Sequence, residues 1–183
     1  MKIMLLYGSY HDHSYTQAVL RSVAGLLHEH QILIPRIHEL PLYCGGPIDS
    51  HIPDRVVHFL EQVGQADALV ICTPEYNHSI PALLKNAIDW ASRPAFQSGL
   101  KDKPVTFITQ AQSPVGGARA QAHLRLVFDS TLSRIHMAPE MLIAGVDQKF
   151  DAQGELVDAR TRERLVRHLD DFVRFAARVG VAA

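Results

Sequence analysis

The stretch DALVICTPEYNHSIPALLKNAIDW, residues 67–90, contains the pattern that decides the fold. Its first part, 67–73, is an almost uninterrupted apolar run, which predicts a strand buried on both faces. A polar and aromatic loop follows, and the spacing of apolar residues then predicts a helix over 80–93. A buried strand that leads through a loop into a helix is typical of a parallel sheet covered by helices.

The same alternation runs along the whole chain. It predicts strands over 2–7, 31–40, 67–73, 103–111 and 140–146, and helices over 16–30, 53–66, 80–93, 116–135 and 158–179. Pro35 predicts an edge position for the strand over 31–40, because proline cannot donate a ladder hydrogen bond. Five strands alternating with five helices predict an α/β doubly wound domain with a five-stranded parallel sheet and helices on both faces. A length of 183 residues suits a single domain over 1–183.

Composition and charge argue against several classes of function. The chain has 18 Lys and Arg against 19 Asp and Glu, with no basic block of the kind that binds nucleic acid. No stretch approaches the roughly 20 apolar residues that a membrane-spanning helix needs, and the first apolar run is too short for a signal peptide. The two cysteines, Cys44 and Cys72, lie far apart, and we expect free thiols in a cytoplasmic protein.

Three loops follow predicted strands, at 8–15, 73–79 and 110–117. In an open parallel sheet, ligands bind beyond the carboxyl ends of the strands, where the strand order reverses. The first loop brings hydroxyl groups to the start of a helix, and free N–H groups there attract an anion. Ser14 or Thr16 could equally be a plain N-cap. Neither the dinucleotide pattern GxGxxG nor the phosphate-loop pattern GxxxxGK[ST] occurs.

The second and third loops suit a flat ligand. Tyr76 offers an aromatic face and Asn77 offers amide groups, so a planar heterocycle could lie against them, although a turn with a surface tyrosine is the simpler interpretation. Gly116 and Gly117 in the third loop allow close approach of backbone to a ligand, but they also fit a flexible turn.

His11, Asp12 and His13 are of residue types that bind metal ions. Three consecutive residues do not easily converge on one ion, and the sequence nominates no fourth ligand, so we expect no metal site here. Among the other histidines, His78 lies in the second loop, at the edge of the predicted ligand site, and we expect most of the rest at the surface.

The second loop and its helix carry a resemblance to a known family. The matching residues are Thr73-Pro74-Glu75-Tyr76-Asn77, Ser79, Pro81, Leu84 to Trp90 and Ser92-Arg93-Pro94, together with Gly8-Ser9, Ser14, Gly116-Gly117, Arg119-Ala120-Gln121 and Leu124-Arg125. This pattern resembles the NAD(P)H-dependent FMN reductase family, the flavodoxin-like group that includes quinone and chromate reductases, over nearly the whole chain. The resemblance implies the sheet order 2-1-3-4-5 and noncovalently bound FMN.

The resemblance also implies which residues contact the cofactor. The phosphate would be held by Ser9, Ser14, the amide of Tyr15 and Thr16; the isoalloxazine would lie against Pro74, Glu75, Tyr76 and Asn77; Gln112 and Ser113 would close the other side. Position 11 is usually arginine and position 16 usually asparagine, where this chain has His11 and Thr16. Arginine is always charged, whereas histidine is charged over only part of the pH range. We interpret His11 as a phosphate contact.

The activity that the resemblance implies is transfer of two electrons from NADPH or NADH, through FMN, to a quinone-like or other small acceptor. It implies no catalytic side chain, and it implies a homodimer or homotetramer. One alternative is an FMN reductase that supplies free reduced flavin to a monooxygenase. Others are a flavodoxin-like electron carrier without NAD(P)H activity and a flavin-free domain that kept the fold. Carriers are typically acidic, which a net charge of −1 does not match.

Overall fold

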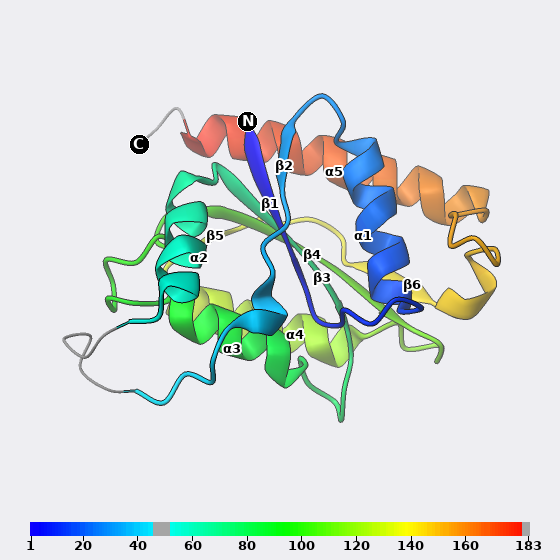
Figure 1. Ribbon diagram of the computed structural model, residues 1–183. Helices are drawn as coiled ribbons and strands as arrows, with labels where there is room; N and C mark the ends of the chain where they lie inside the picture. Colours follow the sequence, from blue (N-terminus) through cyan, green and yellow to red (C-terminus); the bar gives the residue numbers. More distant parts are fainter. Residues whose placement is uncertain (46–51, 181–183) are drawn as a thin grey trace.

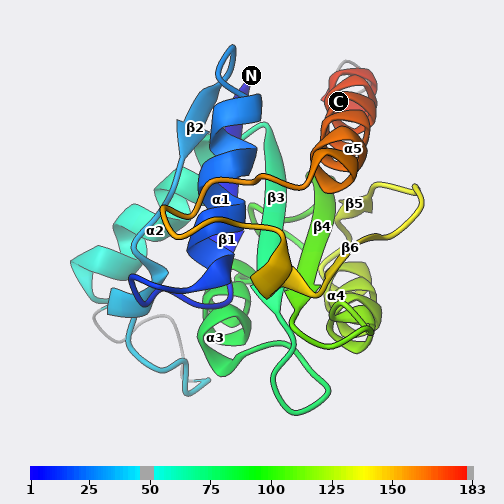
Figure 2. The same cartoon turned by 90° about the vertical axis from the view of Figure 1, so that its right-hand side faces the viewer.

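The structure is a computed structural model that describes residues 1–45 and 52–180. Its strands are β1 (Lys2–Tyr7), β2 (Gln31–Leu33), β3 (Ala68–Pro74), β4 (Pro104–Ala111), β5 (Arg134–Ile135) and β6 (Met141–Ala144). Its helices are α1 (Tyr15–Leu26), α2 (Asp54–Gln65), α3 (Ala82–Ala91), α4 (Ala118–Ser130) and α5 (Ala159–Gly180), with 3₁₀ turns η1 (Ile37–Glu39) and η2 (Val146–Gln148). Helices α1 and α5 cover one face of the sheet, and α2, α3 and α4 cover the other (Figures 1 and 2).

The sheet order is β2-β1-β3-β4-β5, and every strand pair is parallel. This confirms the predicted order 2-1-3-4-5 and the doubly wound α/β class. The chain reverses direction across the sheet between β1 and β3, because β2 lies on one side of β1 and β3 on the other. The loops after β1 and β3 therefore diverge at this point and leave room for a ligand.

The last position of the sheet differs from the prediction of one strand over 140–146. Two short strands share it, since β5 pairs with the start of β4 and β6 pairs with its end. The predicted helix over 116–135 is correspondingly too long. Helix α4 ends at Ser130, because the left-handed backbone of Leu132 (φ 60°) turns the chain back toward the sheet.

The strand predicted over 31–40 is shorter than expected. Strand β2 ends at Leu33, and the chain passes Pro35 before forming the turn η1. Since β2 pairs only with β1 in the sheet order, the predicted edge position is confirmed. A three-residue edge strand exposes few unpaired backbone groups to other chains.

The core lies on both faces of the central strands. All residues of β1 except Lys2, and all of β3 except Pro74, are buried.

Cys72 lies in this core with its thiol free, and burial raises the pKa of that thiol. Cys44 is free and exposed. Within residues 1–45 and 52–180, no helix has the length and apolar character needed to cross a membrane.

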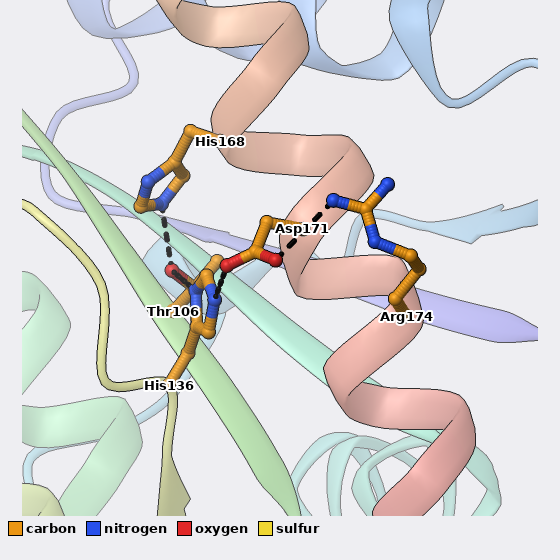
Figure 3. A network of polar contacts seen from close by, with 5 residues as sticks. All are labelled: Thr106, His136, His168, Asp171 and Arg174. Carbon is orange, nitrogen blue, oxygen red and sulfur yellow. Dashed lines mark hydrogen bonds and ion pairs between the residues drawn. The ribbon is translucent and has the colours of Figure 1, made fainter.

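A buried polar network joins the start of β4 to α5 (Figure 3). The Thr106 hydroxyl lies 3.2 Å from His136 Nδ1 and 2.7 Å from His168 Nε2. The other ring nitrogen of His136 lies 2.9 Å from the Asp171 carboxylate, and Arg174 donates to the same carboxylate. His136 is 5% exposed, so it is an exception to the expectation of surface histidines.

Candidate functional site

A cavity of about 480 Å³ lies beyond the carboxyl ends of β1, β3 and β4. It is lined by all the predicted site residues but one, namely Ser9, His11, Ser14, Tyr15, Thr16, Pro74, Glu75, Tyr76, Gln112 and Ser113. The remaining predicted residue, Asn77, is outside this lining. The lining residues come from three loops that are far apart in sequence, and the parallel order of the strands brings these loops together.

The first loop arranges hydroxyl groups around the start of α1. Ser14 is the N-cap of the helix, since its Oγ accepts a hydrogen bond from the Thr16 N–H at 3.1 Å. The Ser14 hydroxyl in turn donates to Ser9 Oγ at 3.0 Å. The Ser14 hydroxyl is therefore the helix cap, and it acts on a ligand only through Ser9, whose hydroxyl it orients. The cap bond orients the hydroxyl groups of Ser14 and Ser9. The free N–H groups and the positive dipole end at the start of the helix also favour an anion there.

Gly8 allows this loop to leave the sheet next to β3. A Cβ at Gly8 would lie 1.9 Å from Thr73 Oγ1 and 2.9 Å from Pro74 Cδ. No side chain fits this gap, so glycine is required where the first and second loops separate.

The second loop is a tight turn. Tyr76 and Ser79 exchange two backbone hydrogen bonds of 2.9 Å each, and the residues between them, Asn77 and His78, have positive φ of 49° and 65°. These features are typical of a type I′ hairpin turn, in which asparagine is favoured. The Ser79 hydroxyl lies 2.9 Å from Nδ1 of His123 on α4, which fixes the turn. Tyr76, half exposed, borders the cavity.

Glu75 has a role that the sequence did not indicate. Its carboxylate accepts hydrogen bonds from the backbone N–H groups of Arg119 and Ala120 in the first turn of α4, at 3.1 and 3.4 Å. It also accepts from Arg119 Nε at 2.6 Å. The N-cap residue of α4, Gly117, has no side chain, so Glu75 supplies the cap from another loop. Glu75 therefore borders the cavity while its carboxylate ties the second loop to the third.

Sequence reasoning missed three further residues of the cavity wall, Gln110, Ala111 and Val146. Gln110 is 1% exposed, and its Nε2 donates to Thr16 Oγ1 at 2.6 Å. A polar residue in the apolar run of β4 was the available signal. Val146 lies in η2, after the last strand, and no motif marks it. His13, which the sequence left outside the site, also lines the cavity.

Within the described residues, no group of three or more His, Cys, Asp and Glu side chains is placed to hold a metal ion. His11 lines the cavity and Asp12 lines a neighbouring pocket next to α1, while His13 lies between them and lines both. The three side chains therefore do not share one space.

The fold and the cavity define a flavodoxin-like α/β protein with a ligand site at the reversal of strand order. The model of the family described as NADPH-dependent FMN reductase matches residues 1–148. An NAD(P)H-dependent FMN reductase of Pseudomonas aeruginosa is 39% identical over 92% of this chain and 91% of its own. A quinone reductase of Escherichia coli is 35% identical over 99% of this chain and 98% of its own.

A solved structure is similar over almost the same length. It is that of FerB, a flavoenzyme NAD(P)H:(acceptor) oxidoreductase of Paracoccus denitrificans, with a TM-score of 0.86 and 28% identity over 97% of both chains. This chain belongs to the NADPH-dependent FMN reductase family. It is a flavin-dependent oxidoreductase of the FMN reductase and quinone reductase type.

The cavity also has the chemistry that FMN requires. Its first loop presents hydroxyl groups at a helix N-terminus, which suits a phosphate. Gln110 Oε1 is buried and has no partner among the described residues, so the wall contains an acceptor without a donor. A buried polar atom of this kind indicates a missing ligand or water, and the hydroxylated chain of FMN carries suitable donors.

Proposed function

We propose that this chain binds FMN noncovalently in the cavity and uses it to pass two electrons from NADPH or NADH to a quinone-like small acceptor. The observation that carries the proposal is the convergence of three separate loops on one cavity that holds every predicted contact except Asn77. Membership of the family supports the cofactor and the activity together. We treat residues 1–183 as one functional domain.

Each loop has a separate task in this proposal. Ser9, Thr16 and the amide of Tyr15 donate to the phosphate, Ser14 contributes by orienting the Ser9 hydroxyl, and His11 is an additional contact. The second loop, from Pro74 to Asn77, faces the ring, and its backbone sets the electrostatic surroundings of the flavin. Gln112 and Ser113 close the opposite side. The hydrogen-bonded turn and the Glu75 cap hold the second loop against α4.

Bound FMN would supply the redox chemistry, accepting two electrons and releasing them in a second step. The protein has to orient the ring and leave one face open to both substrates in turn. Tyr76 is 50% exposed beside the cavity, so it can stack on a nicotinamide or a quinone. No side chain in this scheme acts as a nucleophile or a general acid.

The acceptor, the assembly and the location are further parts of this proposal. A quinone is a flat, largely apolar molecule that suits a site lined by Pro74, Tyr76 and Val146. We propose a homodimer or homotetramer, and Leu126 on α4, with 71% of its surface exposed, is available for such a contact. Two free cysteines support a cytoplasmic location. The proposal involves no nucleic acid and no membrane.

The decisive experiment is an absorbance spectrum of purified protein, reconstituted with FMN and then mixed anaerobically with NADPH or NADH. We expect flavin bands that bleach on addition of the nucleotide and return when a quinone is added. Bands that persist would favour the flavodoxin-like carrier. A protein that remains colourless after FMN is added would overturn the proposal in favour of a flavin-free domain.

A second measurement separates the enzyme with bound flavin from a supplier of free reduced flavin. After turnover with NADPH and a quinone, the protein is passed through a desalting column and its flavin content is measured. Flavin that remains with the protein supports the proposal, whereas flavin lost in proportion to turnover supports the alternative.

A further inference from the structure

Gln110 lies at the point where the three loops meet. It is the seventh residue of β4, it pairs in register with Pro74 of β3, and it is 1% exposed. Its Nε2 donates to Thr16 Oγ1 at 2.6 Å, across 94 residues of sequence. The carbonyl oxygen of the same side chain is buried without a partner in the described part of the chain.

The hydrogen bond from Gln110 determines what the Thr16 hydroxyl can do. A hydroxyl group has one proton to donate and can accept at its oxygen. Since Thr16 Oγ1 accepts from Gln110, its own proton remains available, and among the hydrogen bonds of residues 1–45 and 52–180 no acceptor takes it. Thr16 is the second residue of α1 and lines the cavity. Its proton is therefore free to donate to a ligand at the helix N-terminus.

The hydroxyl groups of Ser14 and Ser9 follow the same logic. The Ser14 hydroxyl donates to Ser9 Oγ, so it has no proton left for a ligand, and Ser9 has one. The hydroxyl protons of Ser9 and Thr16 thus remain available to an anion. In each residue the hydroxyl oxygen already accepts a hydrogen bond, from Ser14 and from Gln110 respectively, so the hydroxyl is free to donate its own proton. Hydrogen bonds from neutral donors to an anion are stronger than those to a neutral acceptor.

We propose that Gln110 is a positioning residue for the phosphate of the flavin, which it serves by holding the Thr16 hydroxyl in the orientation that donates into the cavity. The inference rests on the proposed function, because it assumes that FMN occupies this cavity. The resemblance supports the assignment, since asparagine usually stands at position 16, and asparagine has N–H donors of its own. Threonine has a single hydroxyl proton that must point toward the phosphate, and the hydrogen bond from Gln110 on β4 fixes that orientation.

The test compares FMN with riboflavin, which has the same ring and hydroxylated chain but no phosphate. Dissociation constants for both are measured by quenching of flavin fluorescence, in wild type and in Gln110→Met. The ratio of the two constants isolates the contribution of the phosphate, so any general change in packing cancels. We expect Gln110→Met to reduce the preference for FMN over riboflavin about tenfold, which corresponds to the loss of one hydrogen bond to a charged group.

Thr16 variants show whether Gln110 acts through this residue. Thr16→Val should lose the same preference, whereas Thr16→Ser, which keeps the hydroxyl, should retain it. In the Thr16→Val background, Gln110→Met should have no further effect on the ratio. Gln110→Glu is a second variant of nearly equal size. Its carboxylate takes the Thr16 proton, and we expect it to lose the preference as well.

The outcomes distinguish this inference from the proposed function. If wild type strongly prefers FMN and both Gln110 variants keep that preference, only the role of Gln110 is overturned. Additive effects of the Gln110 and Thr16 substitutions would overturn it too. If wild type binds neither flavin, the proposed function fails and this inference fails with it.

Discussion

Strand β4 carries polar side chains near both of its ends, and the hydrogen bonding of these side chains differs between the two ends. Thr106 and Gln110 are four residues apart, so both point to the face covered by α1 and α5. At the start of the strand, Thr106 contacts two histidines that connect onward to Asp171 and Arg174 (Figure 3). At its end, Gln110 has a partner for its amide nitrogen and, among the described residues, none for its oxygen.

This difference in hydrogen bonding distinguishes polar groups that stabilise the fold from those that, in our proposal, lie in the ligand site. In the Thr106 network, neutral histidines can satisfy every bond, with His136 Nε2–H donating to Asp171, Thr106 donating to His136 Nδ1, and His168 Nε2–H donating to Thr106. The inner part of this network, Thr106 and His136, is buried with its hydrogen bonds made, and such pairing adds rigidity. An unpaired buried atom costs stability, and proteins retain such atoms mainly where they have a function.

The largest effect that we predict is a loss of stability in acid, caused by His168. Burial lowers the pKa of His168 to about 4 from an ordinary value of 6.5, and His136 next to it acts in the same direction. Asp171 opposes this shift and Arg164 adds to it. In the unfolded chain His168 therefore binds a proton below about pH 6.5, whereas in the folded chain it binds one only near pH 4. At 1.36 kcal/mol per pH unit, the free energy of unfolding should fall by roughly 3 kcal/mol between these values.

Urea unfolding at pH 7 and at pH 4.5 measures this loss. The control is His168→Gln, which can still donate a hydrogen bond to Thr106 but does not titrate. The variant should lose markedly less stability than wild type over this range. Equal losses in the two proteins would mean that other groups cause the acid sensitivity.

Thr106→Val tests the same network without a change of pH. The substitution keeps the volume and removes the hydroxyl, so ring nitrogens of His136 and His168 both lose their partner inside the protein. We expect a loss of about 2 kcal/mol in the free energy of unfolding, the usual cost of unpaired buried groups. The measurement is urea unfolding at pH 7. FMN affinity should be unchanged, because the network lies at the opposite end of β4 from the cavity, and a large loss of affinity would contradict the separation of the two regions.

His11 should contribute to FMN affinity through the phosphate, since it lines the same cavity as Ser9 and Thr16. Arginine carries a permanent charge and can hold a phosphate by two parallel hydrogen bonds. His11→Arg should therefore bind FMN severalfold more tightly than wild type, as measured by fluorescence quenching at pH 7. His11→Ala should bind FMN more weakly, while its affinity for riboflavin, which has no phosphate, stays the same. Equal FMN affinity in wild type and His11→Ala would exclude this contact.

The sequence predicts the two ends of β4 unequally well. The cavity could be located because the loops that form it directly follow predicted strands, and the parallel order of a doubly wound sheet brings such loops together. The contact between Glu75 and α4, and that between Gln110 and Thr16, could not be predicted, since each depends on the packing of side chains far apart in sequence.

The network at the start of β4 could not be predicted at all. Its members come from a strand, a loop and a helix, Thr106 and His168 are 62 positions apart, and no motif or periodicity connects them. The same applies to the division of the last strand into β5 and β6. The segment between them contains His136, whose backbone N–H bonds to Val105 and whose ring turns inward to Thr106. His136 is among the histidines that the sequence leads us to expect at the surface.

The smallest effect that we predict comes from Thr109, the matched counterpart of Thr106 on the same strand. Thr109 is fully buried, and its Oγ1 has no partner among the described residues. Thr109→Val keeps the volume and removes only this unpaired oxygen, so the free energy of unfolding should stay the same or rise by up to about 1 kcal/mol. The same substitution three residues earlier costs stability. Urea unfolding of the two variants side by side therefore measures the difference between a paired and an unpaired hydroxyl. If Thr109→Val destabilises the protein as much as Thr106→Val, the Thr109 hydroxyl has a partner, such as a buried water, and the distinction between the two ends of β4 fails at this residue.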